Sequence, residues 1–227
     1  MRQTRNERYP SAGNLQEAVL TGFSAVGRSI LATIGVALLG CIERPATTSS
    51  SHYETPATVG EPSIILLAAG DIADCNSLNG AVATARILGG IDGTIAALGD
   101  LAYPKGTAPQ FRDCYDKTWG HYKNRTRPTP GNHEYYTLGA GPYFAYFGLA
   151  AGDPEKGFYS YDLGTWHILV LNSNCEKIDG GCKADSPQER WLKDDLAAHR
   201  AACTLAYWHH PLFSSGRDPV HAQSLSS

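Results

Sequence analysis

A chain of 227 residues, of which 42% are hydrophobic and 10% aromatic, has enough apolar material for one domain with a substantial core, but hardly enough for two. Its 19 basic and 22 acidic residues are scattered along the sequence and give a formal net charge of −3. This charge pattern lacks the dense positive stripe that a phosphate backbone requires, so nucleic-acid binding is not expected.

The N-terminal segment has the pattern of a secretory signal. Arginines between Arg2 and Arg28 precede an uncharged apolar stretch from Ile30 to Gly40, which ends at Cys41. The stretch is about half of the roughly 20 residues that a spanning helix needs, so a permanent transmembrane segment is the weaker alternative. An ordinary buried helix with a core cysteine is the other. We predict a signal peptide over residues 1–41 and an exported chain, periplasmic or extracellular.

The end of that segment resembles a lipobox, the signal at which bacterial lipoproteins are lipidated. The run Leu-Leu-Gly-Cys over residues 38–41 implies that Cys41 carries a lipid that anchors the chain to the membrane surface. Residues 42–61 are rich in Ser, Thr and Pro and have almost no apolar periodicity, which is typical of a solvated tether. The predicted folded domain then spans residues 62–227.

After the tether, four apolar runs are too short for typical helices and end abruptly in polar residues. They are SIILLAAGD (63–71), GTIAALGD (93–100), HILVLNSN (167–174) and CTLAYWHH (203–210). Near-continuous apolarity of this kind predicts strands that are covered on both faces. Helical spacing of apolar residues predicts helices over about 77–88 and 108–122. Strands that alternate with helices predict an α/β layered architecture.

The best-marked helix begins at Ser186, which can act as its N-cap. Pro187 would take the first helical position, and Glu189 would complete a capping box. The face that we expect to pack on a sheet carries Trp191, Leu192 and Leu196.

Five cysteines follow Cys41, and none has the paired short spacing of a zinc knuckle. In an oxidising compartment they are disulfide candidates. Cys175 and Cys182 flank a Gly-Gly turn and form the best local pair, and Cys75 can pair with Cys114. Cys203 would then be left over.

Two strand ends carry the same dipeptide. Asp71 follows Gly70 at the end of the first run, and Asp100 follows Gly99 at the end of the second. Glycine lets the backbone turn tightly at these points. Because loops from several strands converge at the carboxyl edge of such a sheet, both carboxylates would lie there. Taken singly, each aspartate is more often a helix cap or a turn residue than a ligand.

Two further segments hold side chains that bind metals or donate hydrogen bonds. One is the loop Pro-Gly-Asn-His-Glu over residues 130–134, and the other is the pair His209 and His210 before a proline. A strand-end histidine is usually structural. We interpret as solvated or structural the residues without a partner in these motifs, namely Asp74, Asp113, His121, His167 and His199.

The series Gly-Asp, Gly-Asp-x-x-Tyr, Gly-Asn-His-Glu and His-x-Pro resembles the calcineurin-like metallophosphoesterase family. Within this family, the tyrosine at position 103 makes the motif similar to that of the purple acid phosphatase-like branch. The resemblance covers the sequence from about Ile64 to Asp218 and implies a layered αββα sandwich.

The resemblance also implies a binuclear metal centre. Asp71, Asp100 and Tyr103 would bind the first ion, and Asp100, Asn132 and His209 the second, with Asp100 bridging the two. A shared anion between two close cations is physically required, and a carboxylate supplies it. The phenolate of Tyr103 suits ferric iron, and the second site suits Zn, Fe(II) or Mn.

The activity implied is hydrolysis of phosphate esters by an acid phosphatase-like enzyme, in which a metal-bound hydroxide attacks phosphorus. His133 would contact the substrate or protonate the leaving alkoxide, Glu134 would fix the tautomer of His133, and His210 would contact the phosphate. Phosphomonoesters are the default substrate, with phosphodiesters and nucleotides as competitors. The aromatic residues of segment 135–147 could line a pocket, but loop packing is the better interpretation.

One family motif has no counterpart. Gly-His-x-His, which supplies one histidine to each metal, does not follow Pro211 in this sequence. We therefore expect a domain that is incomplete at its C-terminus, with each metal one ligand short and one sheet edge exposed. Three hypotheses follow: a truncated record of a working hydrolase, an inactive remnant with weak metal affinity, and a tethered binding module on the same scaffold.

Overall fold

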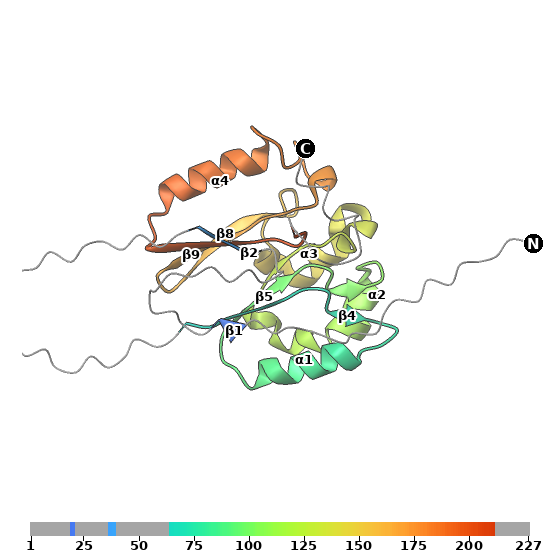
Figure 1. Ribbon diagram of the computed structural model, residues 1–227. Helices are drawn as coiled ribbons and strands as arrows, with labels where there is room; N and C mark the ends of the chain where they lie inside the picture. Colours follow the sequence, from blue (N-terminus) through green and yellow to red (C-terminus); the bar gives the residue numbers. More distant parts are fainter. Residues whose placement is uncertain (1–18, 21–35, 40–63, 212–227) are drawn as a thin grey trace, which may run out of the picture.

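The computed structural model describes residues 19–20, 36–39 and 64–211, which form two stacked four-stranded sheets (Figure 1). The first sheet has the order β1-β3-β5-β7, in which β3, β5 and β7 are parallel and β1 is antiparallel to β3. Its strands are β1 (Val19–Leu20), β3 (Leu66–Ala69), β5 (Thr94–Leu98) and β7 (Thr126–Thr129).

The second sheet has the order β2-β10-β9-β8, and only β9 and β10 are parallel in it. Its strands are β2 (Val36–Leu39), β8 (Tyr159–Leu163), β9 (Trp166–Val170) and β10 (Cys203–Tyr207). A short parallel pair, β4 (Ala73–Asp74) and β6 (Ala102–Tyr103), lies beyond the first sheet. All four predicted strand runs are confirmed, as β3, β5, β9 and β10.

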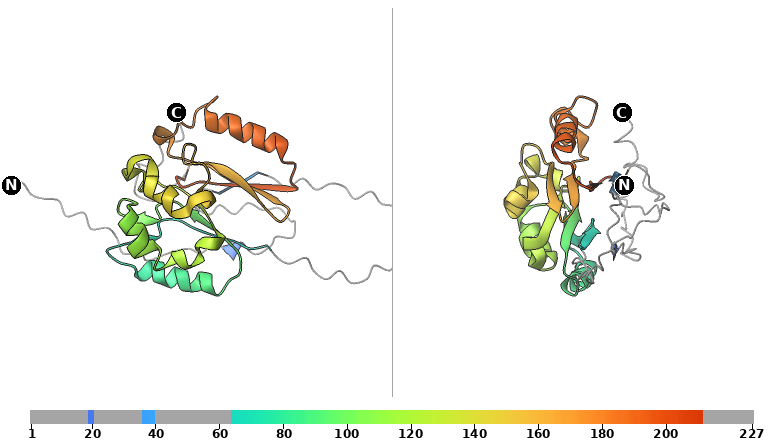
Figure 2. Two further views of the ribbon diagram at one scale, coloured as in Figure 1. Left: turned by 180° about the vertical axis from the view of Figure 1, so that it is seen from behind. Right: turned by 90° about the vertical axis from the view of Figure 1, so that its left-hand side faces the viewer.

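Helices cover the outer faces of both sheets, so the layers follow the predicted αββα order (Figures 1 and 2). Helix α1 (Asn79–Gly89) packs on the first sheet through Ala81, Ala85 and Leu88, and α4 (Pro187–Ala198) lies over the second. The inner faces of the sheets bury a shared core of Ala96, Leu98, Ile168, Val170, Leu205 and Tyr207.

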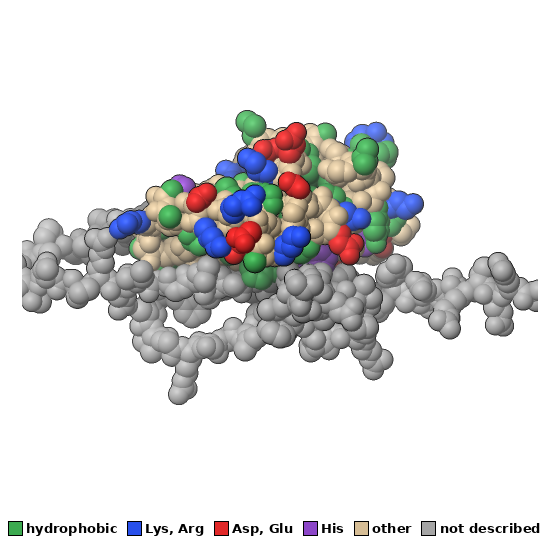
Figure 3. Space-filling view, turned by 90° about the horizontal axis from the view of Figure 1, so that it is seen from above, with side chains coloured by type: hydrophobic (Ala, Val, Ile, Leu, Met, Phe, Trp, Pro, Cys, Tyr) green, Lys and Arg blue, Asp and Glu red, His purple; other side chains and the backbone are tan. Residues whose placement is uncertain are grey.

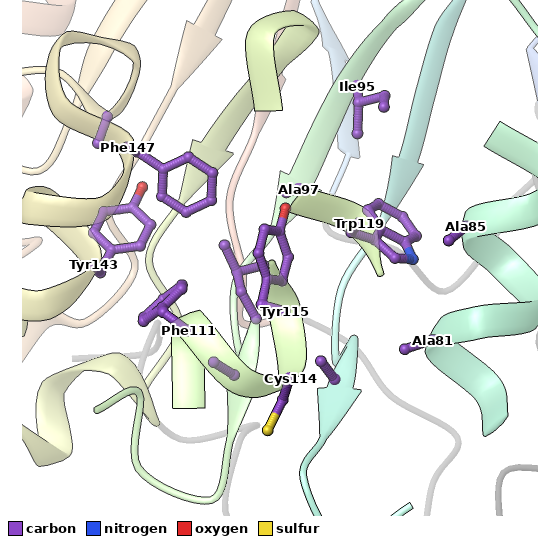
Figure 4. Close-up of a cluster of buried hydrophobic side chains, with 14 of the residues drawn as sticks. Ala81, Ala85, Ile95, Ala97, Phe111, Cys114, Tyr115, Trp119, Tyr143 and Phe147 are labelled. Atoms are coloured by element: carbon purple, nitrogen blue, oxygen red, sulfur yellow. The ribbon is translucent and has the colours of Figure 1, made fainter. Parts of the chain in front are cut away.

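A second core, rich in aromatic rings, lies between the first sheet and the helical segments that follow it (Figure 4). Phe111, Tyr115 and Trp119 meet Tyr143 and Phe147 there, and all five are buried. The last two belong to α3 (Gly141–Phe147). Packing is therefore the correct interpretation of most of the aromatic segment, but its buried rings pack from helix α3 and not from a loop, and Tyr136 is 60% exposed.

The helix predicted over 108–122 is wrong as a single element. The chain forms one turn of α2 (Ala108–Gln110), a π-helix η1 (Phe111–Tyr115) and a 3₁₀ helix η2 (Trp119–Arg125). Thr118 divides them, because its hydroxyl donates to the carbonyls of Cys114 and Tyr115 and so competes with the backbone ladder. Short 3₁₀ turns η3 (Glu134–Tyr136), η4 (Leu138–Ala140), η5 (Gly148–Ala151) and η6 (Cys175–Lys177) complete the fold.

Helix α4 begins as predicted, but its capping box does not close. Ser186 Oγ accepts from the Glu189 backbone N–H at 3.2 Å, whereas the Glu189 carboxylate accepts from the backbone N–H of Asp185 and not from that of Ser186. The predicted apolar face is wrong for Leu196, which is 37% exposed. Gln188 is buried in its place, and its side chain bonds the backbone of Asn172.

Two predicted disulfides are present. Cys75 bonds to Cys114, and Cys175 bonds to Cys182. Cys203 is disulfide-bonded too, so the expectation that it would be left over is wrong.

Strand β2 lies within the segment predicted as a signal peptide. It pairs antiparallel with β10 from Val36–Tyr207 to Leu39–Thr204, and so occupies the sheet edge that we expected to be exposed. The alternative of a buried helix is wrong for these four residues. Cys41 and the predicted tether lie outside the described residues, and the signal peptide stays a prediction. Among the helices of the described part, none is long and apolar enough to cross a membrane.

Candidate active site

The predicted ligands Asp71 and Asp100 lie side by side beyond the carboxyl ends of β3 and β5. Because these strands are parallel neighbours, the two loops leave the sheet together, and the Asp71 N–H donates to the Gly99 carbonyl at 3.0 Å. Both aspartates adopt left-handed backbone conformations, with φ of 55° and 53°. Residues other than glycine rarely adopt this conformation, and it is common at functional sites.

The Oδ2 atom of Asp100 is the centre of the cluster. It lies 3.0 Å from the Tyr103 hydroxyl, 3.5 Å from His209 Nε2 and 3.6 Å from His133 Nε2. The Tyr103 hydroxyl also bonds Asp71 Oδ1, and Asn132 Oδ1 lies 3.2 Å from His209 Nε2. The structure therefore brings together all five side chains predicted as metal ligands, namely Asp71, Asp100, Tyr103, Asn132 and His209.

Two glycines allow this close approach. A Cβ atom on Gly131 would lie 2.1 Å from Asp100 Oδ1, and one on Gly99 would lie 2.7 Å from His209 Nδ1. Neither position can carry a side chain without displacing a predicted ligand. The glycines that precede Asp100 and Asn132 are therefore part of the site.

His209 is oriented by a backbone carbonyl. Its Nδ1–H donates to Leu98 O at 2.7 Å, so Nε2 faces Asn132 and Asp100. Burial by itself lowers the pKa of His209, but the Asp100 carboxylate outweighs it and raises the pKa to about 9. Burial also disfavours the charged form of Asp100, and by itself it raises the pKa of this carboxyl group. His209 and His133 outweigh burial and hold the pKa of Asp100 below its ordinary value. The site thus keeps a carboxylate charged in the interior.

Glu134 has a different role from the one predicted. It is fully buried, and its two oxygens accept the backbone N–H groups of Asp100 at 2.8 Å, Leu101 at 2.9 Å and Gly131 at 2.8 Å. Burial and the nearby Asp100 charge raise the pKa of Glu134, against these bonds. Glu134 therefore fixes the two loops that carry Asp100 and Asn132.

His133 is oriented by Pro104 and not by Glu134, which corrects the prediction about its tautomer. Its Nδ1–H donates to the Pro104 carbonyl at 2.7 Å, and this leaves Nε2 as the nitrogen that faces Asp100. The ring lies between those of Tyr103 and Tyr136, with centroids 4.4 and 4.7 Å away. Sequence analysis could not identify Pro104 as the partner of His133. Pro104 contributes a backbone carbonyl oxygen, which every residue has, so its residue type gives no signal.

His210 is buried next to His209, with ring centroids 4.8 Å apart. Its Nδ1 lies 2.8 Å from Ser173 Oγ, and its backbone N–H donates to the same oxygen at 3.0 Å. Ser173, in the loop after β9, therefore fixes the segment that carries His209. The contact of His210 with phosphate stays a prediction.

The donor set fits the cations that were predicted. Carboxylate, phenol and amide oxygens are hard donors, and one imidazole nitrogen adds affinity for Zn, Fe or Mn. Asp100 Oδ2 lies within reach of both halves of the set, Tyr103 and His209, which is the position that a bridging ligand needs.

Away from this site, His167 and His199, which the sequence analysis interprets as structural, lie close together in the structure. The ligand atoms of His167, Asp195 and His199 all lie within 4.8 Å of one another. The Asp-x-x-x-His spacing at the end of a helix is a signal that sequence analysis could have used, since residues i and i+4 share a helix face.

Comparison with known proteins agrees with this geometry. A family model described as Calcineurin-like phosphoesterase matches residues 55–225, which is most of the chain and all of the described active-site residues. No curated protein matches the chain.

Proposed function

Because the chain belongs to the calcineurin-like phosphoesterase family, we propose that the cluster around Asp100 is its metal centre and that it hydrolyses phosphate esters as an acid phosphatase of the purple type. One observation supports this most strongly: Asp100 Oδ2 lies 3.0 Å from the Tyr103 hydroxyl and 3.5 Å from His209 Nε2, so it contacts a predicted ligand of each ion. Such a position is what a carboxylate between two cations requires.

The chain's own residues would divide the remaining work. Two cations bound here would supply Lewis acidity, which lowers the pKa of water and neutralises charge on the phosphate. Asp71 and Tyr103 would hold one of them, Asn132 and His209 the other. His133, with Nε2 directed at the cluster, would donate a hydrogen bond or a proton to the leaving oxygen.

The rim of the site suggests the kind of leaving group. Tyr136 is 60% exposed and its ring lies against His133, and Leu138 nearby is 99% exposed. An aromatic leaving group could stack on this rim while its phosphate reaches Asp100. This arrangement favours phosphomonoesters with an aromatic or apolar alcohol.

Substitution of Tyr103 tests whether the first metal ion is iron. A phenolate bound to ferric iron gives a visible charge-transfer absorption, so iron-loaded protein should be coloured. Tyr103→Phe should lose this absorption and keep its fold, since the hydroxyl bonds only to Asp71 and Asp100 among the described residues. Visible spectroscopy with iron quantification checks both. Tyr122→Phe is the matched control, and an identical spectrum in Tyr103→Phe would contradict iron at this position.

The full chain, expressed and purified, tests the activity itself. We expect bound Fe, Zn or Mn by elemental analysis, and hydrolysis of p-nitrophenyl phosphate that chelation abolishes and the returned metal restores. Weak or no metal binding would favour an inactive remnant. A soluble, folded chain whose affinity for a partner survives chelation would favour the binding module instead.

A further inference from the structure

The cluster of His167, Asp195 and His199 lies at the opposite end of the second sheet from the active site. His167 is the second residue of β9, and Asp195 and His199 lie at the end of α4, which covers that sheet (Figure 1). The predicted ligands of the active site instead follow the carboxyl ends of β3, β5, β7 and β10, or lie in β6. The cluster is therefore separate from the site described above.

Its three side chains surround one point at the junction of sheet and helix. His167 Nε2 lies 2.6 Å from Asp195 Oδ2, and His199 Nδ1 lies 3.6 Å from Asp195 Oδ1. The two imidazole rings are nearly parallel, with centroids 4.3 Å apart and an angle of 13°. The exposed fractions of the side chains are 1% for His167, 7% for Asp195 and 45% for His199. The cluster thus has two fixed members and one at the surface.

Two further residues orient the buried members. Asp162 Oδ1 lies 2.7 Å from His167 Nδ1, and Ser160 Oγ donates to Asp195 Oδ1 at 2.8 Å. A carboxylate on the far nitrogen of a histidine is the usual partner of a metal-binding imidazole, because it fixes the ring and raises its basicity. Beside His199 and Asp162 a surface hollow of about 440 Å³ gives access from solvent.

We propose that His167 Nε2, Asp195 and His199 bind a divalent transition cation of the zinc class, with water in the remaining position. Two imidazoles and one carboxylate are a known ligand set for zinc, at bond lengths of about 2.0–2.2 Å. The cation takes the place of the proton between His167 and Asp195, and half-exposed His199 turns its ring to complete the set. It would join the sheet to α4, whose buried residue among positions 187–198 is the polar Gln188.

An ion pair at His167, together with a hydrogen bond at the end of the helix, is the competing explanation. Two carboxylates around His167 would stabilise an imidazolium without help. His199 Nδ1 also lies 2.9 Å from the backbone oxygen of Asp195, and this hydrogen bond at the end of α4 holds the His199 ring beside that of His167, with centroids 4.3 Å apart. A metal ion would instead bind both imidazoles and the same carboxylate, so zinc binding that depends on His199 distinguishes the two explanations.

Zinc titration of the full chain tests the proposal. Asp100→Asn serves as the background, since it removes the bridging ligand of the active site and makes the second site measurable. In this background Zn²⁺ should bind and raise the thermal midpoint, and adding His199→Ala should lower the zinc affinity at least about tenfold. His199 is half-exposed, so its loss should leave the fold intact, as circular dichroism would show.

His121→Ala is the matched control, because His121 is an exposed histidine of η2 outside the cluster. It should change neither zinc affinity nor thermal midpoint. Equal zinc binding by the His199→Ala and His121→Ala variants would overturn the proposal. The proposal would also be overturned if up to about 100 μM Zn²⁺ caused no shift of the thermal midpoint. That concentration corresponds to a binding free energy of about 5.5 kcal/mol. The ion pair would then be the remaining explanation of the cluster. Neither result depends on phosphatase activity.

Discussion

Asp100→Asn is expected to lower the hydrolysis of p-nitrophenyl phosphate by roughly 10³-fold, the order seen when one preorganised electrostatic contact is lost from an active site. The amide removes the negative charge that two cations would share, so metal content should fall as well. The fold should survive, because asparagine tolerates φ of 53° and its carbonyl can still accept the His133 backbone N–H. Measurements of kcat/KM and of bound metal check the prediction.

The control for this variant is Asp113→Asn. Asp113 pairs with Arg112 on the surface, with a side chain that is 47% exposed, so rate and metal content should be unchanged. If Asp100→Asn keeps both metals and a wild-type rate, Asp100 is not the bridging ligand.

Glu134→Ala should destabilise the fold by at least about 3 kcal/mol. The change leaves three buried backbone N–H groups without their acceptor, and each unsatisfied donor costs about 1–3 kcal/mol. Such a loss is a large part of a typical total stability of about 5–15 kcal/mol. Urea unfolding, followed by far-UV circular dichroism, measures the change.

Two comparisons separate this effect from a general cost of removing a glutamate. Glu134→Gln keeps one acceptor oxygen and should have an intermediate stability. Glu155→Ala removes an exposed side chain and should be within about 0.5 kcal/mol of the parent chain. Equal stability of the two alanine variants would mean that water replaces the carboxylate without cost.

The residues that sequence alone could place share one property: their signal is local. Each apolar run ends at a polar residue, so Asp71, Asp100 and His209 could be assigned to strand ends, and the parallel order of β3 and β5 then brings the aspartates together. The same holds for Ser186, whose capping role depends on residues within one helical turn.

What the sequence could not predict depends on contacts between distant segments. Glu134 accepts from Asp100 and Leu101, more than thirty residues earlier, so its adjacency to His133 was misleading. His167 meets Asp195 across 28 residues and two elements. Periodicity of side chains carries no information about which backbone groups of another loop need an acceptor, and these pairings decide both roles.

If Asp71 and Asp100 bind metal as proposed, their left-handed backbone sets metal binding against thermal stability. Glycine at either position would relieve a backbone penalty of the order of 1 kcal/mol. A selection for heat-resistant variants should therefore enrich substitutions at these two positions and, with them, inactive proteins. The proposed metal binding by the two carboxylates would oppose those substitutions, so a gain in stability at either position would come at the expense of hydrolysis.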